Sequence, residues 1–174
     1  MTTNPQIPNA EVLLSRLEQK LTPLIQPQTA IIGIHSGGAW IAERLLPLLQ
    51  QAHPDCSLVF GTLDSSFYRD DYHQRGLHTE TRPSQISFDV ENRHIILLDD
   101  VFYTGRTIRA AMNELFDYGR PASITLAVLV DRGGRELPIC PQVAAIQLEL
   151  PFEQKLQLSR DDNNLLHFSL EANA

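Results

Sequence analysis

Short apolar runs that alternate with helical segments are the feature of this sequence that most constrains its fold. Four runs predict strands, at residues 30–34 (AIIGI), 58–64 (LVFGTLD), 94–98 (HIILL) and 123–130 (SITLAVLV). Strands that are apolar nearly throughout are typical of parallel sheets, because helices cover both of their faces. We therefore expect an α/β fold, a mostly parallel twisted sheet flanked by helices, built by residues 1–174 as a single domain.

Three segments have helical periodicity. Residues 9–22 carry leucines at helical spacing behind Asn9, a typical N-cap, and residues 39–51 form a second helix that Pro47 kinks or brings to its last turn. Residues 106–118 form a third, which ends at the stop signals Gly119 and Pro121. Its predicted apolar face consists of Ile108, Ala111, Met112, Leu115 and Phe116.

Two further segments complete the predicted organisation. Residues 65–93 form a long polar connection with few apolar residues and little periodicity. A connection of this length in a compact domain is usually a functional lid or a disordered insert, and a flexible hairpin in part of it is an open alternative. Near the C-terminus, residues 155–170 (KLQLSRDDNNLLHFSL) predict two strands around a turn at residues 161–164.

Chemically distinctive residues follow three of the predicted strands. They are His35-Ser36-Gly37-Gly38 after the first, Asp99-Asp100 with Thr104-Gly105-Arg106-Thr107 after the third, and Asp131-Arg132-Gly133-Gly134-Arg135-Glu136 after the fourth. Parallel strands end at the same edge of a sheet, and open sheets of this kind bind ligands there. The sequence therefore predicts one binding site formed by these three loops.

The acid pair and the TGRT turn point to a phosphorylated sugar. A helix N-terminus offers unpaired N–H groups and a partial positive charge, which suit a phosphate, although a Thr before a helix is often an ordinary cap. Asp99 and Asp100 would repel each other unless they bind hydroxyls or a cation. A ribose 5-phosphate carries both hydroxyls and phosphate. The remaining alternative is a solvated acid pair beside a capped helix.

The stretch IILLDDVFYTGRT, residues 95–107, resembles the phosphoribosyl pyrophosphate (PRPP) signature of the type I phosphoribosyltransferases. DDVFYTGRTIRAAM, GRPASITLAVLVDRGGRELPI and the SSFYRDD segment are, in addition, similar to the PyrR family of pyrimidine-operon regulators that are also uracil phosphoribosyltransferases. The similarity extends over roughly residues 28–140. It implies the type I phosphoribosyltransferase fold, with residues 65–93 as a flexible hood loop over the site.

The resemblance also implies roles for individual residues. Asp99 and Asp100 would act in catalysis by binding the ribose hydroxyls, either directly or through Mg²⁺, the expected cofactor, with or without intervening water. Arg69 would neutralise the leaving pyrophosphate. The PRPP phosphates would be bound by two loops, Thr104, Gly105, Arg106 and Thr107 for the 5-phosphate and His35, Ser36, Gly37 and Gly38 for the pyrophosphate. The base would be bordered by Tyr103, Val130, Asp131 and Arg132, the last three largely through backbone groups. Tyr103 stands where purine-specific relatives usually have Asp, which favours a pyrimidine.

The sequence departs from the family pattern in two places. His35-Ser36-Gly37-Gly38 replaces a loop that resembles Lys-Thr-Arg-Gly, and Gly134 stands where many members have His. The net charge is −7, whereas affinity for RNA follows the number of phosphates neutralised. We therefore expect a uracil phosphoribosyltransferase that uses PRPP and uracil and releases UMP. The first alternative is an RNA-binding attenuation regulator of the pyrimidine operon, which responds to UMP or UTP and binds the pyr leader RNA with little or no turnover. The second alternative is a phosphoribosyltransferase that acts on another base.

Composition excludes several other classes of protein. No apolar run approaches the roughly 20 residues that span a bilayer, and the N-terminus MTTNPQIPNAEVLL does not read as a signal peptide. Cys56 and Cys140 lie far apart without metal-ligand spacing. These patterns predict a cytoplasmic protein with no membrane partner, and the resemblance implies a homodimer or a higher homo-oligomer.

Overall fold

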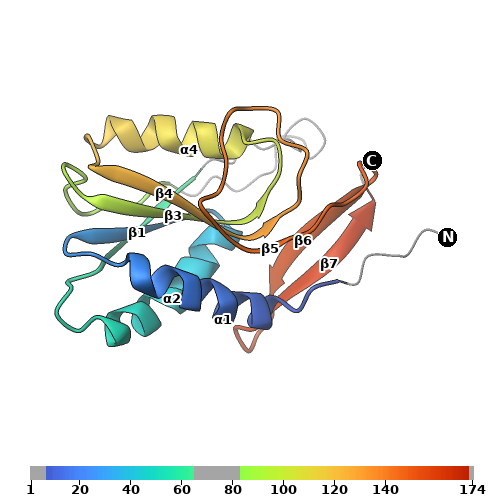
Figure 1. Cartoon of the computed structure of the whole chain (residues 1–174), viewed down its shortest axis with the longest axis horizontal. Helices are drawn as coiled ribbons and strands as arrows, with labels where there is room; N and C mark the ends of the chain where they lie inside the picture. The colour runs from blue at the N-terminus through green and yellow to red at the C-terminus, as the bar shows by residue number, and fades with distance from the viewer. Residues whose placement is uncertain (1–6, 65–82, 173–174) are drawn as a thin grey trace.

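The computed structural model describes residues 7–64 and 83–172, and within them five strands form one sheet (Figure 1). These strands are β1 (Thr29–Ile34), β2 (Val59–Leu63), β3 (His94–Phe102), β4 (Ser123–Asp131) and β5 (Val143–Gln147). Their order is β2-β1-β3-β4-β5, and every pairing is parallel, which confirms the predicted sheet. The order reverses between β1 and β3, the point at which doubly wound sheets bind their ligands.

Helices cover both faces of the sheet. α1 (Ala10–Leu21), followed by the 3-10 turn η1 (Thr22–Leu24), and α2 (Gly37–Ala52) pack on one face, and α4 (Arg106–Asp117) packs on the other (Figure 1). Alternate residues of β3 feed the two cores: Ile96 and Leu98 point to the α1–α2 side, whereas Ile95 and Leu97 point to the α4 side. This alternation follows from the two-residue period of a strand, but it does not run to the end of β3, because Val101 packs on the α1–α2 side and Phe102 on the α4 side.

The predicted helices form with small differences. Asn9 caps α1 as expected, since its Oδ1 accepts a hydrogen bond from the Val12 N–H at 3.1 Å. α2 begins earlier than predicted, at Gly37, and continues through Pro47 to Ala52. Assigning Phe116 to the apolar face of α4 was wrong, because its residue is 52% exposed. It follows the buried Leu115, and the turn of about 100° per residue carries it to the solvent side.

The C-terminal part of the chain contains one strand that the sequence analysis missed. β5 is a short edge strand in which only Val143 and Ala145 are buried, so its apolar signal is weak. After it, β6 (Gln154–Arg160) and β7 (Leu166–Ala172) pair in an antiparallel hairpin, as predicted. In its turn the Asn164 N–H donates to the Asp161 carbonyl at 2.9 Å, and Asn164 has a left-handed φ of 65°.

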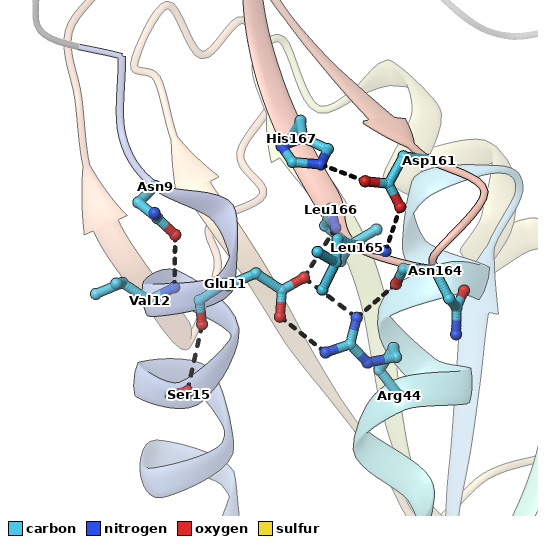
Figure 2. A network of polar contacts seen from close by, with 10 residues as sticks. All are labelled: Asn9, Glu11, Val12, Ser15, Arg44, Asp161, Asn164, Leu165, Leu166 and His167. Carbon is cyan, nitrogen blue, oxygen red and sulfur yellow. Dashed lines mark hydrogen bonds and ion pairs between the residues drawn. The ribbon is translucent and has the colours of Figure 1, made fainter.

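An ion-paired network fastens this hairpin to the helices (Figure 2). The Arg44 guanidinium on α2 donates to both carboxylate oxygens of Glu11 on α1, at 3.1 and 2.8 Å. Arg44 also donates to the Asn164 carbonyl at 2.7 Å, and Glu11 accepts the Leu166 N–H at 2.8 Å. Three elements that are distant in sequence are therefore joined through two side chains.

Part of the predicted hood segment belongs to the body of the fold. Gln85 forms an antiparallel bridge with Thr62 of β2, with two N–H···O bonds of 2.8 and 2.9 Å, and Val90 is fully buried beside α4. The apolar side chains of Ile86, Phe88 and Val90 therefore pack in the core on the α4 side, and the flexibility of the hood segment stays a prediction. Residues 65–82, with Arg69, lie outside the described residues.

In the part of the chain that the structure describes, no helix is long and apolar enough to cross a membrane. Cys56 and Cys140 are both free; Cys56 is partly buried and Cys140 is exposed.

Candidate active site

The loops that follow β1 and β3 meet at the point where the strand order reverses. β1 and β3 are parallel neighbours, so their carboxyl ends lie side by side. A Cβ placed on Gly37, at the start of α2, would lie 2.5 Å from both Cγ and Oδ2 of Asp100. The structure therefore brings together the predicted pyrophosphate loop and one of the two predicted ribose-binding acids.

Close backbone packing explains the glycines of the β1–α2 loop. A Cβ on Gly38 would overlap the carbonyl oxygen of Leu98 on β3, and a Cβ on Gly33 would lie 2.5 Å from the Gly38 carbonyl oxygen. Any side chain at these positions would push the start of α2 away from the sheet. The peptide bond between His35 and Ser36, immediately before this turn, is cis.

The two acids belong to β3 itself rather than to a loop after it. Asp100 faces the start of α2, since a Cβ on Gly37 would lie 2.5 Å from its Cγ and Oδ2. Asp99 is 4% exposed, whereas Asp100 is half-buried, and the Asp100 N–H donates to Asp99 Oδ1 at 3.0 Å. The two neighbouring acids therefore have different environments.

Two helices begin after the strands that carry the site. α2 begins after Ser36, whose side chain makes no capping hydrogen bond, whereas at the start of α4 the Thr104 hydroxyl accepts the Arg106 N–H at 3.2 Å. Neither helix has an acidic residue in its first turn, in contrast to α1, which has Asn9 as the cap and Glu11 in the first turn. A helix N-terminus with unsatisfied N–H groups and a positive dipole is suited to an anion, and α2 meets this condition more fully than α4.

The loop before α4 is braced by the loop that follows β4. Thr104 is 4% exposed, and its carbonyl accepts the N–H groups of Glu136 and Leu137 at 3.0 and 3.2 Å. Arg106, a predicted phosphate ligand, directs its guanidinium to the Glu136 carboxylate at 2.6 and 3.0 Å. Thr107 is half-buried in the first turn of α4. Glu136 belongs to the third of the predicted site loops, although its pairing with Arg106 was not predicted.

Two of the residues predicted to border the base, Tyr103 and Arg132, are in contact with each other. The Arg132 guanidinium carbon lies 3.9 Å from the centroid of the Tyr103 ring. Arg132 is 5% exposed, and burial lowers the pKa of its guanidinium, an effect that the nearby Tyr103 opposes. Asp131 is also buried, and its Oδ1 accepts the Gly133 N–H at 3.2 Å. Contact between Arg132 and Tyr103 is long-range, so sequence spacing gave no sign of it.

Backbone groups of this loop already have partners. The Arg132 N–H donates to the Phe102 carbonyl at 3.0 Å, and the Asp131 carbonyl accepts the Leu148 N–H at 2.9 Å. Val130 lies inside β4, in register with Val101 and Ile146 of the neighbouring strands. The Arg132 N–H and the Asp131 carbonyl are therefore already engaged in hydrogen bonds within the fold.

Comparisons with known proteins agree with this geometry. The family described as "Phosphoribosyl transferase domain" matches residues 6–152. A "Bifunctional protein PyrR" from Nitrosococcus oceani is 48% identical over 159 residues, which are 91% of this chain and 87% of the relative. Another of the same name, from Pseudomonas syringae pv. tomato, is 52% identical over 128 residues, 74% of this chain and 72% of the relative.

Solved structures share the fold at low sequence identity. A hypoxanthine phosphoribosyltransferase from Trypanosoma cruzi superposes with a TM-score of 0.63 at 17% identity, covering 83% of this chain and 82% of the other. One from Staphylococcus aureus superposes with a TM-score of 0.61 at 19% identity, covering 83% and 78%. The matching family and the relatives agree, and the chain belongs to the phosphoribosyl transferase domain family, within which it is a member of the PyrR family.

Proposed function

We propose that this protein transfers the phosphoribosyl group of PRPP to uracil, which yields UMP and pyrophosphate. The observation that carries the proposal is that Asp100 lies beside the uncapped N-terminus of α2, with Asp99 next to it in β3 and the start of α4 after the same strand. PRPP carries phosphate at both ends of a ribose with vicinal hydroxyls. The site offers two anion positions with carboxylates between them, which matches that distribution of charge.

The leaving pyrophosphate fits the start of α2. Cleavage of the C1–O bond builds positive charge on the ribose ring and negative charge on the pyrophosphate. N–H groups fixed at a helix N-terminus stabilise such developing charge without reorganisation, and closure against water strengthens the effect. In this proposal the backbone of residues 35–38 holds the pyrophosphate, and Arg69, from the hood segment, adds a positive charge.

Asp99 and Asp100 would both bind the ribose. Asp100 lies beside Gly37 at the proposed pyrophosphate position, and Asp99 is buried next to it in β3. The proposed contacts are hydrogen bonds from the two ribose hydroxyls to these carboxylates. Neither cysteine lies in these loops, and the reaction needs no covalent intermediate with a side chain.

The donor set at the site fits Mg²⁺, the cofactor that we propose. Mg²⁺ prefers oxygen ligands and is usually bound by one or two carboxylates together with substrate phosphates and water. Within residues 7–64 and 83–172 no group of three His, Cys, Asp or Glu side chains could hold a metal by itself. Asp100 beside the pyrophosphate position would share the ion with PRPP, and the bound ion would neutralise the leaving group.

Regulation of a pyrimidine operon through the pyr leader RNA is the second candidate function. The observation that favours it is the name of the relatives, each called a bifunctional protein. The net charge of −7 supports it poorly, because RNA affinity rises with the number of phosphates neutralised. Arg16 and Arg135 are the basic residues that we would assign to such a surface.

One set of assays separates these functions. Purified protein is given PRPP and Mg²⁺ with uracil, hypoxanthine or guanine, and product formation is followed by chromatography. UMP formed from uracil alone supports the proposal, whereas a product from hypoxanthine or guanine, or no product at all, refutes it. Binding to the pyr leader RNA is measured in parallel at several salt concentrations, and tight sequence-specific binding that UMP strengthens would favour the regulatory function.

A further inference from the structure

Tyr103 lies against Gly134, in the loop that follows β4, as well as against Arg132. A Cβ built on Gly134 would overlap the Cε2 atom of the Tyr103 ring and lie 2.9 Å from its Cδ2 atom. Real Cβ atoms essentially never approach other atoms so closely, so a side chain at position 134 and the present position of the ring exclude each other. The ring therefore occupies space that is available only because residue 134 is glycine.

The Arg132 guanidinium supports the same ring. Its carbon lies 3.9 Å from the ring centroid, and the residue is 5% exposed. Nη2 reaches the Pro151 carbonyl at 3.4 Å, and Nε has no hydrogen-bond partner within the described residues. A cation so poorly served by hydrogen bonds gains its main interaction from the aromatic face. The Arg132 guanidinium thus stabilises the present position of the Tyr103 ring.

We infer that Gly134 is a positioning residue for uracil: its missing side chain, together with the Arg132 guanidinium, sets where the Tyr103 ring stands as a wall of the base site. The inference rests on the proposed function, since it takes uracil as the base. It assigns to Gly134 an effect on the base and not on PRPP, whose loops lie at the starts of α2 and α4.

The neighbouring glycine provides a matched control. Gly133 and Gly134 have almost the same left-handed backbone, with φ of 74° and 76°. Alanine at either position therefore meets the same backbone cost, since L side chains disfavour this region. At Gly133, however, a Cβ would meet only Glu149 Cγ at 3.8 Å, which is an ordinary contact. Any excess effect at Gly134 consequently comes from the collision with Tyr103.

The test compares Gly134→Ala with Gly133→Ala, each in the wild-type and the Tyr103→Ala background. For Gly134→Ala we expect KM for uracil to rise by about tenfold more than for Gly133→Ala, the upper end of what a displaced aromatic contact is worth. KM for PRPP should change equally in both. In the Tyr103→Ala background the two alanine variants should become equivalent, because the ring is absent.

Thermal unfolding of the same variants gives a readout that does not depend on activity. Gly134→Ala should unfold at a lower temperature than Gly133→Ala, and this difference should vanish without Tyr103. Equal uracil KM values for the two alanine variants, or an excess that survives Tyr103→Ala, would overturn the inference. If the wild type forms no UMP, the proposed function fails, and the positioning role for uracil fails with it. The unfolding cycle then still reports whether Gly134 and Tyr103 are coupled.

Discussion

Replacing Glu11 with glutamine should detach the C-terminal hairpin from the two helices that it packs on (Figure 2). The Glu11 carboxylate accepts hydrogen bonds from Arg44 at 3.1 and 2.8 Å and from the Leu166 N–H at 2.8 Å. Glutamine keeps one neutral acceptor but loses the charge and one of the two contacts with the guanidinium. Arg44 also holds the Asn164 carbonyl, so the loss affects the hairpin turn as well.

The size of the effect follows from the exposure of the pair. The Arg44 and Glu11 side chains are 27% and 32% exposed, so solvent screens the interaction only in part. Hydrogen bonds to charged groups contribute about 1.5–3 kcal/mol when buried, whereas exposed ion pairs contribute about 0.2–1 kcal/mol. We therefore expect Glu11→Gln to lower the free energy of unfolding by about 1–2 kcal/mol. For a chain of this length that corresponds to a fall of roughly 2–8 °C in Tm.

A second ion pair on α2 provides the control. Arg160 and Glu43 form a single contact of 2.8 Å between α2 and β6, with Glu43 50% exposed. Glu43→Gln should cost at most about 1 kcal/mol. Both variants are compared with the wild type by urea unfolding and by calorimetry at pH 7. A Glu11→Gln variant as stable as the wild type, or no less stable than Glu43→Gln, would refute the reasoning.

The same network should make stability depend on pH. The hydrogen bonds from Arg44 hold the pKa of the Glu11 carboxyl below its usual value of 4.5. A carboxyl with a depressed folded-state pKa contributes stability that is present above its unfolded-state pKa and is lost as pH falls through the folded-state pKa. The stability difference between wild type and Glu11→Gln should therefore shrink when unfolding is measured below pH 4.5. A difference that stays constant down to acidic pH would contradict this account.

Three further predictions concern the active site. Gly38→Ala should destabilise the protein more than Gly37→Ala in thermal unfolding, because its Cβ meets the rigid backbone of β3 rather than a movable carboxylate. Gly37→Ala should instead weaken PRPP binding in calorimetry, since Asp100 must move, and unchanged affinity would contradict the proposed role of that acid. Glu136→Gln should tighten PRPP binding by about threefold at low salt, because it removes the negative partner of the partly exposed Arg106 guanidinium. Arg106→Gln should weaken PRPP binding by about the same factor, because it removes the positive charge.

The sequence indicated most of the fold because its signals are local. Apolar runs such as AIIGI and SITLAVLV form buried strands, and their apolar residues indicate this without knowledge of the neighbouring strands. The turn at residues 161–164 closes through a hydrogen bond between its own backbone groups. The rule that parallel strands end at one edge then placed Gly37 and Asp100 together without knowledge of any contact between them. β5 was not predicted; it is a short edge strand in which only Val143 and Ala145 are buried.

The tertiary structure decided how the site residues face one another. The prediction ended the third strand at residue 98, whereas β3 continues to Phe102 and therefore contains both Asp99 and Asp100. The partners of Arg106 and Tyr103 come from the loop after β4, about 30 residues later in the chain. Residue types and their order along the strands determined which chemistry this edge of the sheet can support. Packing between distant segments determined which side chains come into contact. The sequence shows that residue 134 is glycine, but only the tertiary structure shows that the Tyr103 ring occupies the space a side chain there would need.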